Sequence, residues 1–446
     1  MDYEDIIYLA VLIGSIFVGY FFQKIQSPET KRWFSTILGT VICTVVCGFH
    51  VLHGICVTLT IGLIIKFSYR YCHGLSFAAG FLYLVFFRTT EYFNIPYPTG
   101  HANMIQMILT LKLVGLAFEV HDNHVTERKM KKDEKSVTDQ DIYRLFPKPS
   151  ILEVFHYAFC YAGVLTGPYF TYCTYRDMLK YPLKECKLHV QETLKIVAYV
   201  PLFSILYLGA SKVFPLHVLF SDEFYNQSPF PYRLWYMYST FFIFRMRMYI
   251  AFRLSEAVCI MAGLGLYPVS TKPRAGSGPS CNFEALSEMN KMSSGGYNFE
   301  TIDTIRVLDA EFSTTVREAT RYWNRSIQYW LAAYVYRRFP FKKYKTLMTF
   351  FISSFWHGIH AGYYFSLFSV PLYLFVEDTF VKRVIKHDQN KLKNFLLWNA
   401  KMFQFSYWGL AFQVKDSIVI WKYGMSVYFA PYIVAIVMYF VAVLIK

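Results

Sequence analysis

The 446-residue sequence is too apolar for an ordinary soluble domain, since 55% of its residues are hydrophobic, 20% are aromatic and its mean hydropathy is +0.28. Its 45 Lys and Arg residues outnumber its 30 Asp and Glu residues, which gives a formal net charge of +15. The basic residues lie in loops between apolar runs. Such a pattern is typical of positive-inside membrane topology and of contact with anionic lipid headgroups, not of nucleic-acid binding. Composition thus indicates a multi-pass integral membrane protein without a nucleic-acid partner.

The apolar runs predict an all-α protein of about 11 transmembrane helices, with further interfacial helices enclosing a chamber. Residues 1–446 are predicted to form a single membrane domain. The first run follows acidic residues, where a cleaved signal would need positive charge, so it is predicted to be a retained helix. The candidate spans, some of them expected to be interfacial, are 6–22, 34–65 (two, divided near Gly48–Gly54), 75–93, 104–120, 151–170, 195–214, 234–266, 326–336, 346–376 (two), 395–413 and 427–445.

Two polar segments interrupt the apolar pattern. Segment 121–149 is rich in Lys and Arg and is predicted to be a basic cytoplasmic loop. His121 and His124 have the spacing of helical metal ligands, but no third ligand follows them, so no metal site is predicted. Segment 271–325 begins rich in Gly and Ser and then becomes amphipathic. It is predicted to be a flexible loop followed by interfacial helices that lead to an active site.

Charged residues also occur inside the apolar run 241–260, namely Arg245, Arg247, Arg253 and Glu256. Arg253 and Glu256 have the i,i+3 spacing of a pair within one helix. A buried arginine in a membrane needs an anionic partner. Glu256 alone would satisfy this need, and so would the phosphate of a lipid or a nucleotide.

His357 lies near the middle of a stretch, 346–376, that contains no Lys, Arg, Asp or Glu. Because a single pass needs about 20 apolar residues, this stretch predicts two short helices that meet near Gly358–Gly362. An ionisable residue so deep in a membrane is costly and suggests function. Imidazole, with an ordinary pKa of about 6.5, can accept and return a proton near neutral pH. The alternative is a core histidine bonded to a carbonyl. His50 and His53, one turn apart on one helix face, are instead interpreted as interfacial.

Asn324 precedes the next apolar run and has three interpretations. It opens an Asn-Arg-Ser glycosylation sequence, but the basic segment 337–345 soon afterwards argues for a cytoplasmic position. It could also cap a helix. Alternatively, its amide works together with His357.

The runs Arg321-Tyr322-Trp323-Asn324 and Ser354-Phe355-Trp356-His357-Gly358-Ile359-His360, in a multi-pass protein, resemble the membrane-bound O-acyltransferase family. Further runs resemble the branch that acylates lysophosphatidylinositol; they lie at 31–33, 109–114, 166–170, 244–247 and 275–279. That branch often has proline where this sequence has Ala361, a departure that affects a turn and not the chemistry.

This resemblance implies that His357 and Asn324 are the catalytic residues, and that no cofactor or metal is permanently bound. It also implies an acyl-CoA co-substrate and a lysophospholipid acceptor, most simply lysophosphatidylinositol. The transferred chain would be polyunsaturated, such as arachidonoyl, and the enzyme would reside in the endoplasmic reticulum for phospholipid remodelling. The substrate-binding candidates are Tyr322, Trp323, Trp356, His360, Arg245 and Arg247.

Two alternatives stay open. A member of the same family could act on another lysophospholipid, a sterol or a protein. More remotely, a transporter would also use broken helices and a buried histidine, although the two halves of this sequence show no inverted repeat.

Overall fold

The computed structural model describes residues 3–132, 137–181, 186–281, 283, 296–385 and 390–445. Over these residues the chain is mainly helical. Its one short sheet pairs β1 (Tyr267–Pro268) with β2 (Tyr297–Asn298) in antiparallel register. The all-α prediction is therefore confirmed. Half of the predicted flexible loop, residues 282 and 284–295, lies outside the described residues.

The chain forms two compact units, each assembled from separate stretches. Unit 1 consists of Met1–Ala198, Ala251–Thr304 and Arg325–Tyr334, and unit 2 consists of Tyr199–Ile250, Ile305–Asn324 and Val335–Lys446. The long helix α12 (Phe230–Met261) contributes to both. Because the chain passes repeatedly from one unit to the other, neither unit is a contiguous domain that could be cut out of the sequence.

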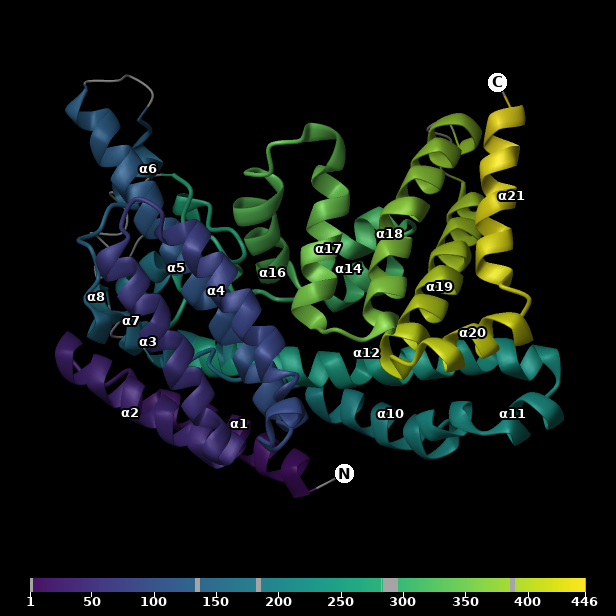
Figure 1. Ribbon diagram of the computed structural model, residues 1–446, viewed down its shortest axis with the longest axis horizontal. Coiled ribbons are helices and arrows are strands. Elements are labelled where there is room, and N and C mark those ends of the chain that lie inside the picture. Colours follow the sequence, from purple (N-terminus) through teal and green to yellow (C-terminus); the bar gives the residue numbers. More distant parts are fainter. Residues whose placement is uncertain are drawn as a thin grey trace. The chain divides into compact units, whose positions relative to one another are not determined.

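In unit 1, α3, α4 and α5 pack side by side (Figure 1). Gly48 separates α2 from α3, as predicted, and its N–H donates to the Thr44 carbonyl at the end of α2. The helices of this unit are α1 (Tyr3–Phe22), α2 (Pro28–Cys47), α3 (Val51–Phe67), α4 (Cys72–Phe87), α5 (Gly100–Lys131), α6 (Asp139–Tyr143), α7 (Ile151–Ala158), α8 (Tyr172–Lys180), α9 (Cys186–Val197) and α16 (Arg325–Trp330).

Two predictions within unit 1 are corrected by the structure. The span predicted over 151–170 is only the eight-residue helix α7, after which the backbone turns at Gly163 and Gly167, both with positive φ. Its non-helical part is buried, which is how irregular backbone is tolerated in membrane proteins. In addition, α5 continues to Lys131, so the first part of segment 121–149 is helical. The helix can continue because residues 121–131 contain no Gly or Pro, and the basic residues of its last turn stabilise its C-terminus.

In unit 2, α17, α18, α19 and α21 pack side by side around a buried aromatic core that includes Tyr373, Tyr407, Trp408 and Tyr423 (Figure 1). The helices of this unit are α10 (Val200–Val213), α11 (Asp222–Gln227), α14 (Val307–Phe312), α15 (Val316–Tyr322), α17 (Lys345–His357), α18 (Ala361–Phe380), α19 (Lys391–Val414), α20 (Ser417–Ser426) and α21 (Ala430–Leu444).

Five helical stretches in the described part of the chain are long and apolar enough to cross a membrane, or six if the pair α20 and α21, bent by 64°, makes one span. The five are Tyr3–Phe22, Pro28–Phe67, Gly100–Lys131, Lys187–Phe220 and Ala361–Ile385. Other candidates are shorter, such as the 16-residue α4 and the 13-residue α17, or carry several charges, as α12 does. A multi-pass protein is supported, while the count of about 11 stays a prediction.

Candidate active site

His357 is the last residue of α17, directly before a break between two helices of unit 2. The N–H of Gly358 closes α17 by donating to the Ser354 carbonyl at 3.0 Å. A Cβ atom at Gly358 would lie only 2.5 Å from the Tyr363 ring, so glycine lets this ring approach the break. Helix α18 then begins after His360. The predicted break between two helices is thus confirmed, but only α17, with 13 residues, is short, since α18 has 20 residues and extends beyond residue 376.

Gly362 holds α18 close to the end of α19. Its N–H donates to the Lys415 carbonyl at 3.1 Å. A Cβ atom at this position would lie 2.3 Å from the Ala411 carbonyl oxygen and 2.7 Å from Cα of Lys415. Because both obstacles are backbone atoms, a side chain here would force the two helices apart.

We expect Gly362→Ala to lower the free energy of unfolding by about 1–3 kcal/mol, the usual cost of overpacking. The midpoint of thermal unfolding in detergent would report this loss. Gly209→Ala is the matched control, because Gly209 lies in α10 of the same unit with no atom within 4 Å of its added Cβ. The midpoint of thermal unfolding of Gly209→Ala should be no lower than that of the wild type. Equal midpoints for the two variants would contradict the close packing of α18 on α19.

Aromatic rings surround the half-buried imidazole of His357. The Phe412 ring is perpendicular to it at 4.9 Å between centroids, and the Trp356 and Tyr363 rings lie at 4.8 and 5.9 Å. Tyr363 also contacts Phe412 at 4.7 Å. Trp356 is itself buried. These contacts fix the imidazole in a largely apolar setting, where a proton acceptor is little screened by water.

The same cluster of rings extends to the second predicted motif. Phe244 of α12 lies 5.7 Å from Phe412 and 6.4 Å from Trp323, the residue that precedes Asn324. Tyr249, further along α12, lies 5.9 Å from Trp323. Within unit 2 the structure therefore connects the Tyr-Trp-Asn and Trp-His segments through one continuous set of aromatic contacts.

Asn324 has a left-handed backbone conformation, with φ of +48°. Asparagine adopts this conformation more readily than most residues other than glycine. The backbone on either side is held in place: the Arg306 N–H donates to the Tyr322 carbonyl at 3.1 Å, and the Arg325 N–H donates to the Thr304 carbonyl at 2.8 Å. Its half-buried amide thus projects from a tightly defined turn.

The other predicted site residues differ in exposure. Tyr322 and Trp323 are half-buried, whereas His360 and Arg247 are exposed. Arg245 is buried, and its Nε lies 2.8 Å from Oε1 of Glu311, which also accepts a hydrogen bond from the Tyr249 hydroxyl at 2.5 Å.

The anionic partner that the sequence requires for Arg245 is therefore present within the protein. The predicted pair Arg253–Glu256 is confirmed at 2.7 Å, and it belongs to unit 1.

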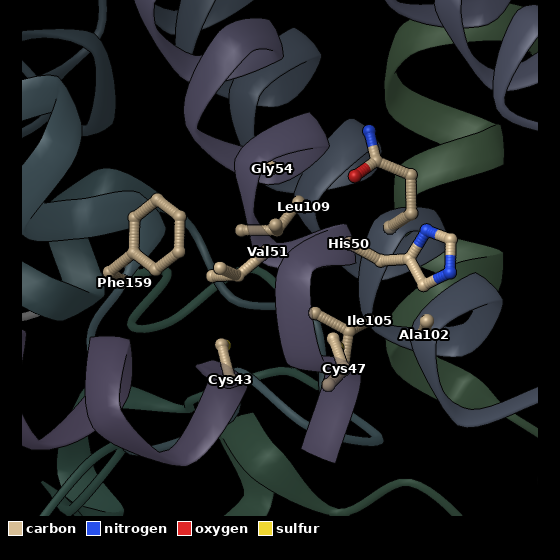
Figure 2. Close-up of a pocket in the computed structure, with 10 residues that line it drawn as sticks. Cys43, Cys47, His50, Val51, Gly54, Ala102, Ile105, Leu109 and Phe159 are labelled. Carbon is tan, nitrogen blue, oxygen red and sulfur yellow. The ribbon is translucent and has the colours of Figure 1, made fainter. Parts of the chain in front are cut away.

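Unit 1 contains a separate small cavity of about 10 Å³, room for about one water molecule. Figure 2 shows His50 beside it; the other lining residues are Cys43, Cys47, Val51, Gly54, Ala102, Ile105, Gln106, Leu109 and Phe159. His50 is buried and the His53 ring bonds the Tyr83 hydroxyl at 3.0 Å. The His50 side chain thus packs within the protein, and the interfacial interpretation of the two histidines stays a prediction.

Two buried charges near the predicted motif were not singled out by the sequence analysis. Glu377 of α18 and Lys401 of α19 hold the short helices α14 and α15, which lead to Asn324. Both lie in or at the edge of predicted spans. The rule that made His357 a candidate, an ionisable residue within an apolar run, would have found them too.

Comparison of the sequence with known proteins shows its family. The family model of the membrane-bound O-acyltransferases matches residues 82–412, which include Asn324 and His357. The chain belongs to this family. The predicted resemblance is thereby confirmed, and the enzyme class follows from it.

Three relatives of this membrane-bound O-acyltransferase are similar over almost their whole length. All three are named membrane-bound acylglycerophosphatidylinositol O-acyltransferases. The Drosophila melanogaster protein is 40% identical, over 97% of this chain and 91% of its own. The mouse and human proteins are 37% and 36% identical, each over 98% of this chain and 93% of their own.

Proposed function

We propose that this family member transfers a fatty acyl group from acyl-CoA to the sn-2 hydroxyl of lysophosphatidylinositol. The observation that carries the proposal is the similarity of 36–40% identity, over nearly the full chain, to proteins named for this acceptor. We further propose a polyunsaturated chain such as arachidonoyl, about 11 spans and residence in the endoplasmic reticulum. The half-buried imidazole at a helix break supports a catalytic chamber in unit 2.

In the proposed reaction the neutral imidazole of His357 accepts the proton of the sn-2 hydroxyl. The hydroxyl oxygen then attacks the thioester carbonyl, an ester C–O bond forms and the C–S bond breaks. CoA leaves as a thiolate and takes up the proton held by the imidazole. A hydroxyl is a poor nucleophile until a base within about 3 Å accepts its proton, so the base accounts for much of the rate. Since the thioester is already activated, the step needs neither a metal nor a covalent enzyme intermediate.

Asn324 is proposed to act on the charge that develops during this step. Its amide can donate a hydrogen bond to the oxyanion of the tetrahedral intermediate, or orient the imidazole or the hydroxyl. A preorganised donor of this kind typically contributes 10²–10³-fold in rate. The fixed turn around Asn324 supports this role, because a donor must be in place before the charge forms.

CoA carries phosphates, whereas the acyl chain is apolar, so the two parts of the donor need different surroundings. Exposed basic side chains between residue 336 and α17 suit the phosphates; they are Arg337, Arg338, Lys342 and Lys343. We propose that CoA docks there and that the acyl chain extends toward His357. Arg247, exposed on α12, is a further candidate for a phosphate of CoA or inositol.

The acceptor is tested by offering arachidonoyl-CoA and a panel of lysophospholipids to the purified protein in detergent. We expect transfer to lysophosphatidylinositol to exceed transfer to the choline, ethanolamine and serine lysolipids by at least about tenfold, equivalent to about 1.4 kcal/mol in transition-state binding. A preference for another lysolipid would retain the family activity and reject this acceptor. No transfer to any of them by a well-folded protein would reject lysophospholipid acylation.

A further inference from the structure

The N-terminus of α15 (Val316–Tyr322) is held by a buried carboxylate from another helix of unit 2. The first N–H groups of a helix have no partner within it. Here Glu377 of α18 accepts from the N–H of Val316 at 2.7 Å and from that of Arg317 at 3.1 Å. The hydroxyl of Thr315 accepts from the next free N–H, that of Glu318, at 3.2 Å. Burying the Glu377 carboxylate costs free energy. The two hydrogen bonds and the positive end of the helix dipole offset this cost.

The C-terminus of the preceding helix α14 (Val307–Phe312) is held in the complementary way. Lys401 of α19, which is fully buried, donates to the carbonyls of Ala310, Glu311 and Ser313 at 3.2, 2.8 and 2.7 Å. All three donors of its ammonium group are therefore matched by carbonyls that a helix end leaves free. The Trp398 indole N–H adds a bond to the Glu311 carbonyl at 2.7 Å.

These contacts matter for chemistry because α15 leads directly into the turn that contains Asn324. The helix has seven residues and ends at Tyr322, so Asn324 comes two residues beyond its last turn. A helix of this length spans only about 10 Å, so its two ends lie close together. A shift at its N-terminus would therefore move the turn that carries the Asn324 amide.

We propose that Glu377 and Lys401 are positioning residues, which clamp the corner between α14 and α15 and so fix the Asn324 amide for acyl transfer. The inference rests on the catalytic role proposed for Asn324. Neither side chain needs to contact substrate. Their effect is to hold the Asn324 amide in its reactive position, and misplacing a catalytic group by 1 Å can cost about 100-fold in rate.

The neighbour of Glu377 provides a matched control. Asp378 pairs with the Arg317 side chain through two bonds, from Nε to Oδ1 at 2.9 Å and from Nη2 to Oδ2, but the two side chains are 39% and 44% exposed. Exposed ion pairs contribute little to the free energy of unfolding. Asp378 thus contacts the same helix from the same end of α18 without holding its backbone.

The experiment measures kcat and KM for arachidonoyl-CoA and lysophosphatidylinositol in Glu377→Gln, Asp378→Asn, Asn324→Ala and the double variant Asn324→Ala/Glu377→Gln. We expect Glu377→Gln to lower kcat by about 10- to 100-fold with KM within about twofold, because one of the two accepting oxygens becomes an NH2 group, which cannot accept from a backbone N–H. Asp378→Asn should stay within about twofold of wild type. In the Asn324→Ala background, Glu377→Gln should cost no more than about threefold, because residues that act as a unit are not additive.

The inference would be overturned if kcat were unchanged in Glu377→Gln, or if kcat fell equally in Asp378→Asn. It would also be overturned if Glu377→Gln lowered kcat in the Asn324→Ala background by as much as in the wild type. That result would mean that Glu377 has a general structural role. If Glu377→Gln does not fold, Lys401→Gln replaces it in the same cycle with the same expectations. Failure of the proposed function is distinguishable, because it would appear as an inactive wild type or a fully active Asn324→Ala.

Discussion

Replacing His357 by alanine is expected to lower kcat for acyl transfer by about 10²–10⁴-fold, the usual contribution of a general base. The sn-2 hydroxyl would then have to lose its proton to water, which a largely aromatic setting restricts. The rings of Phe412 and Trp356 contact the imidazole, but His357 is only half-buried and the buried aromatic core of unit 2 is formed by other residues. We therefore expect the variant to fold.

The measurement is turnover with arachidonoyl-CoA and lysophosphatidylinositol, together with the thermal midpoint and the elution volume of each protein. His217→Ala is the matched control, because His217 is an exposed histidine of the same unit, in the short helix Leu216–Phe220. It should retain wild-type turnover. Near-normal turnover in a folded His357→Ala protein would refute the general-base mechanism.

The second large effect is expected at Asn324, where two substitutions separate the side chain from the backbone. Alanine removes the amide and also has to adopt the left-handed conformation, at a cost of roughly 1–2 kcal/mol. Glycine removes the amide but adopts φ of +48° freely. If the amide stabilises the transition state, both variants lose about 10²–10³-fold in kcat.

Only Asn324→Ala should also unfold at a lower temperature, so comparing kcat with the thermal midpoint assigns each effect to its cause. High activity in Asn324→Gly would show that the turn matters and the amide does not. It would also remove the basis for the positioning role of Glu377 and Lys401.

Some features could be predicted from sequence because they depend on neighbouring residues. The break at Gly358 follows from an apolar stretch too long for one pass, and the Arg253–Glu256 pair follows from helical spacing. The prediction of a membrane span over 151–170 was wrong, because hydropathy does not distinguish a membrane helix from irregular backbone that is buried in the protein. In the structure the backbone of this segment turns at Gly163.

The sequence by itself determined the membrane class, the helical fold and the family, since composition, periodicity and the two motifs around Asn324 and His357 are local properties. Only the tertiary structure decided which distant residues meet. It paired Arg245 with Glu311 and brought Glu377 and Lys401 to the ends of α15 and α14. The physical reason is that a buried charge is satisfied by whichever opposite charge or free backbone group packing brings within about 3 Å, and sequence distance does not limit that choice.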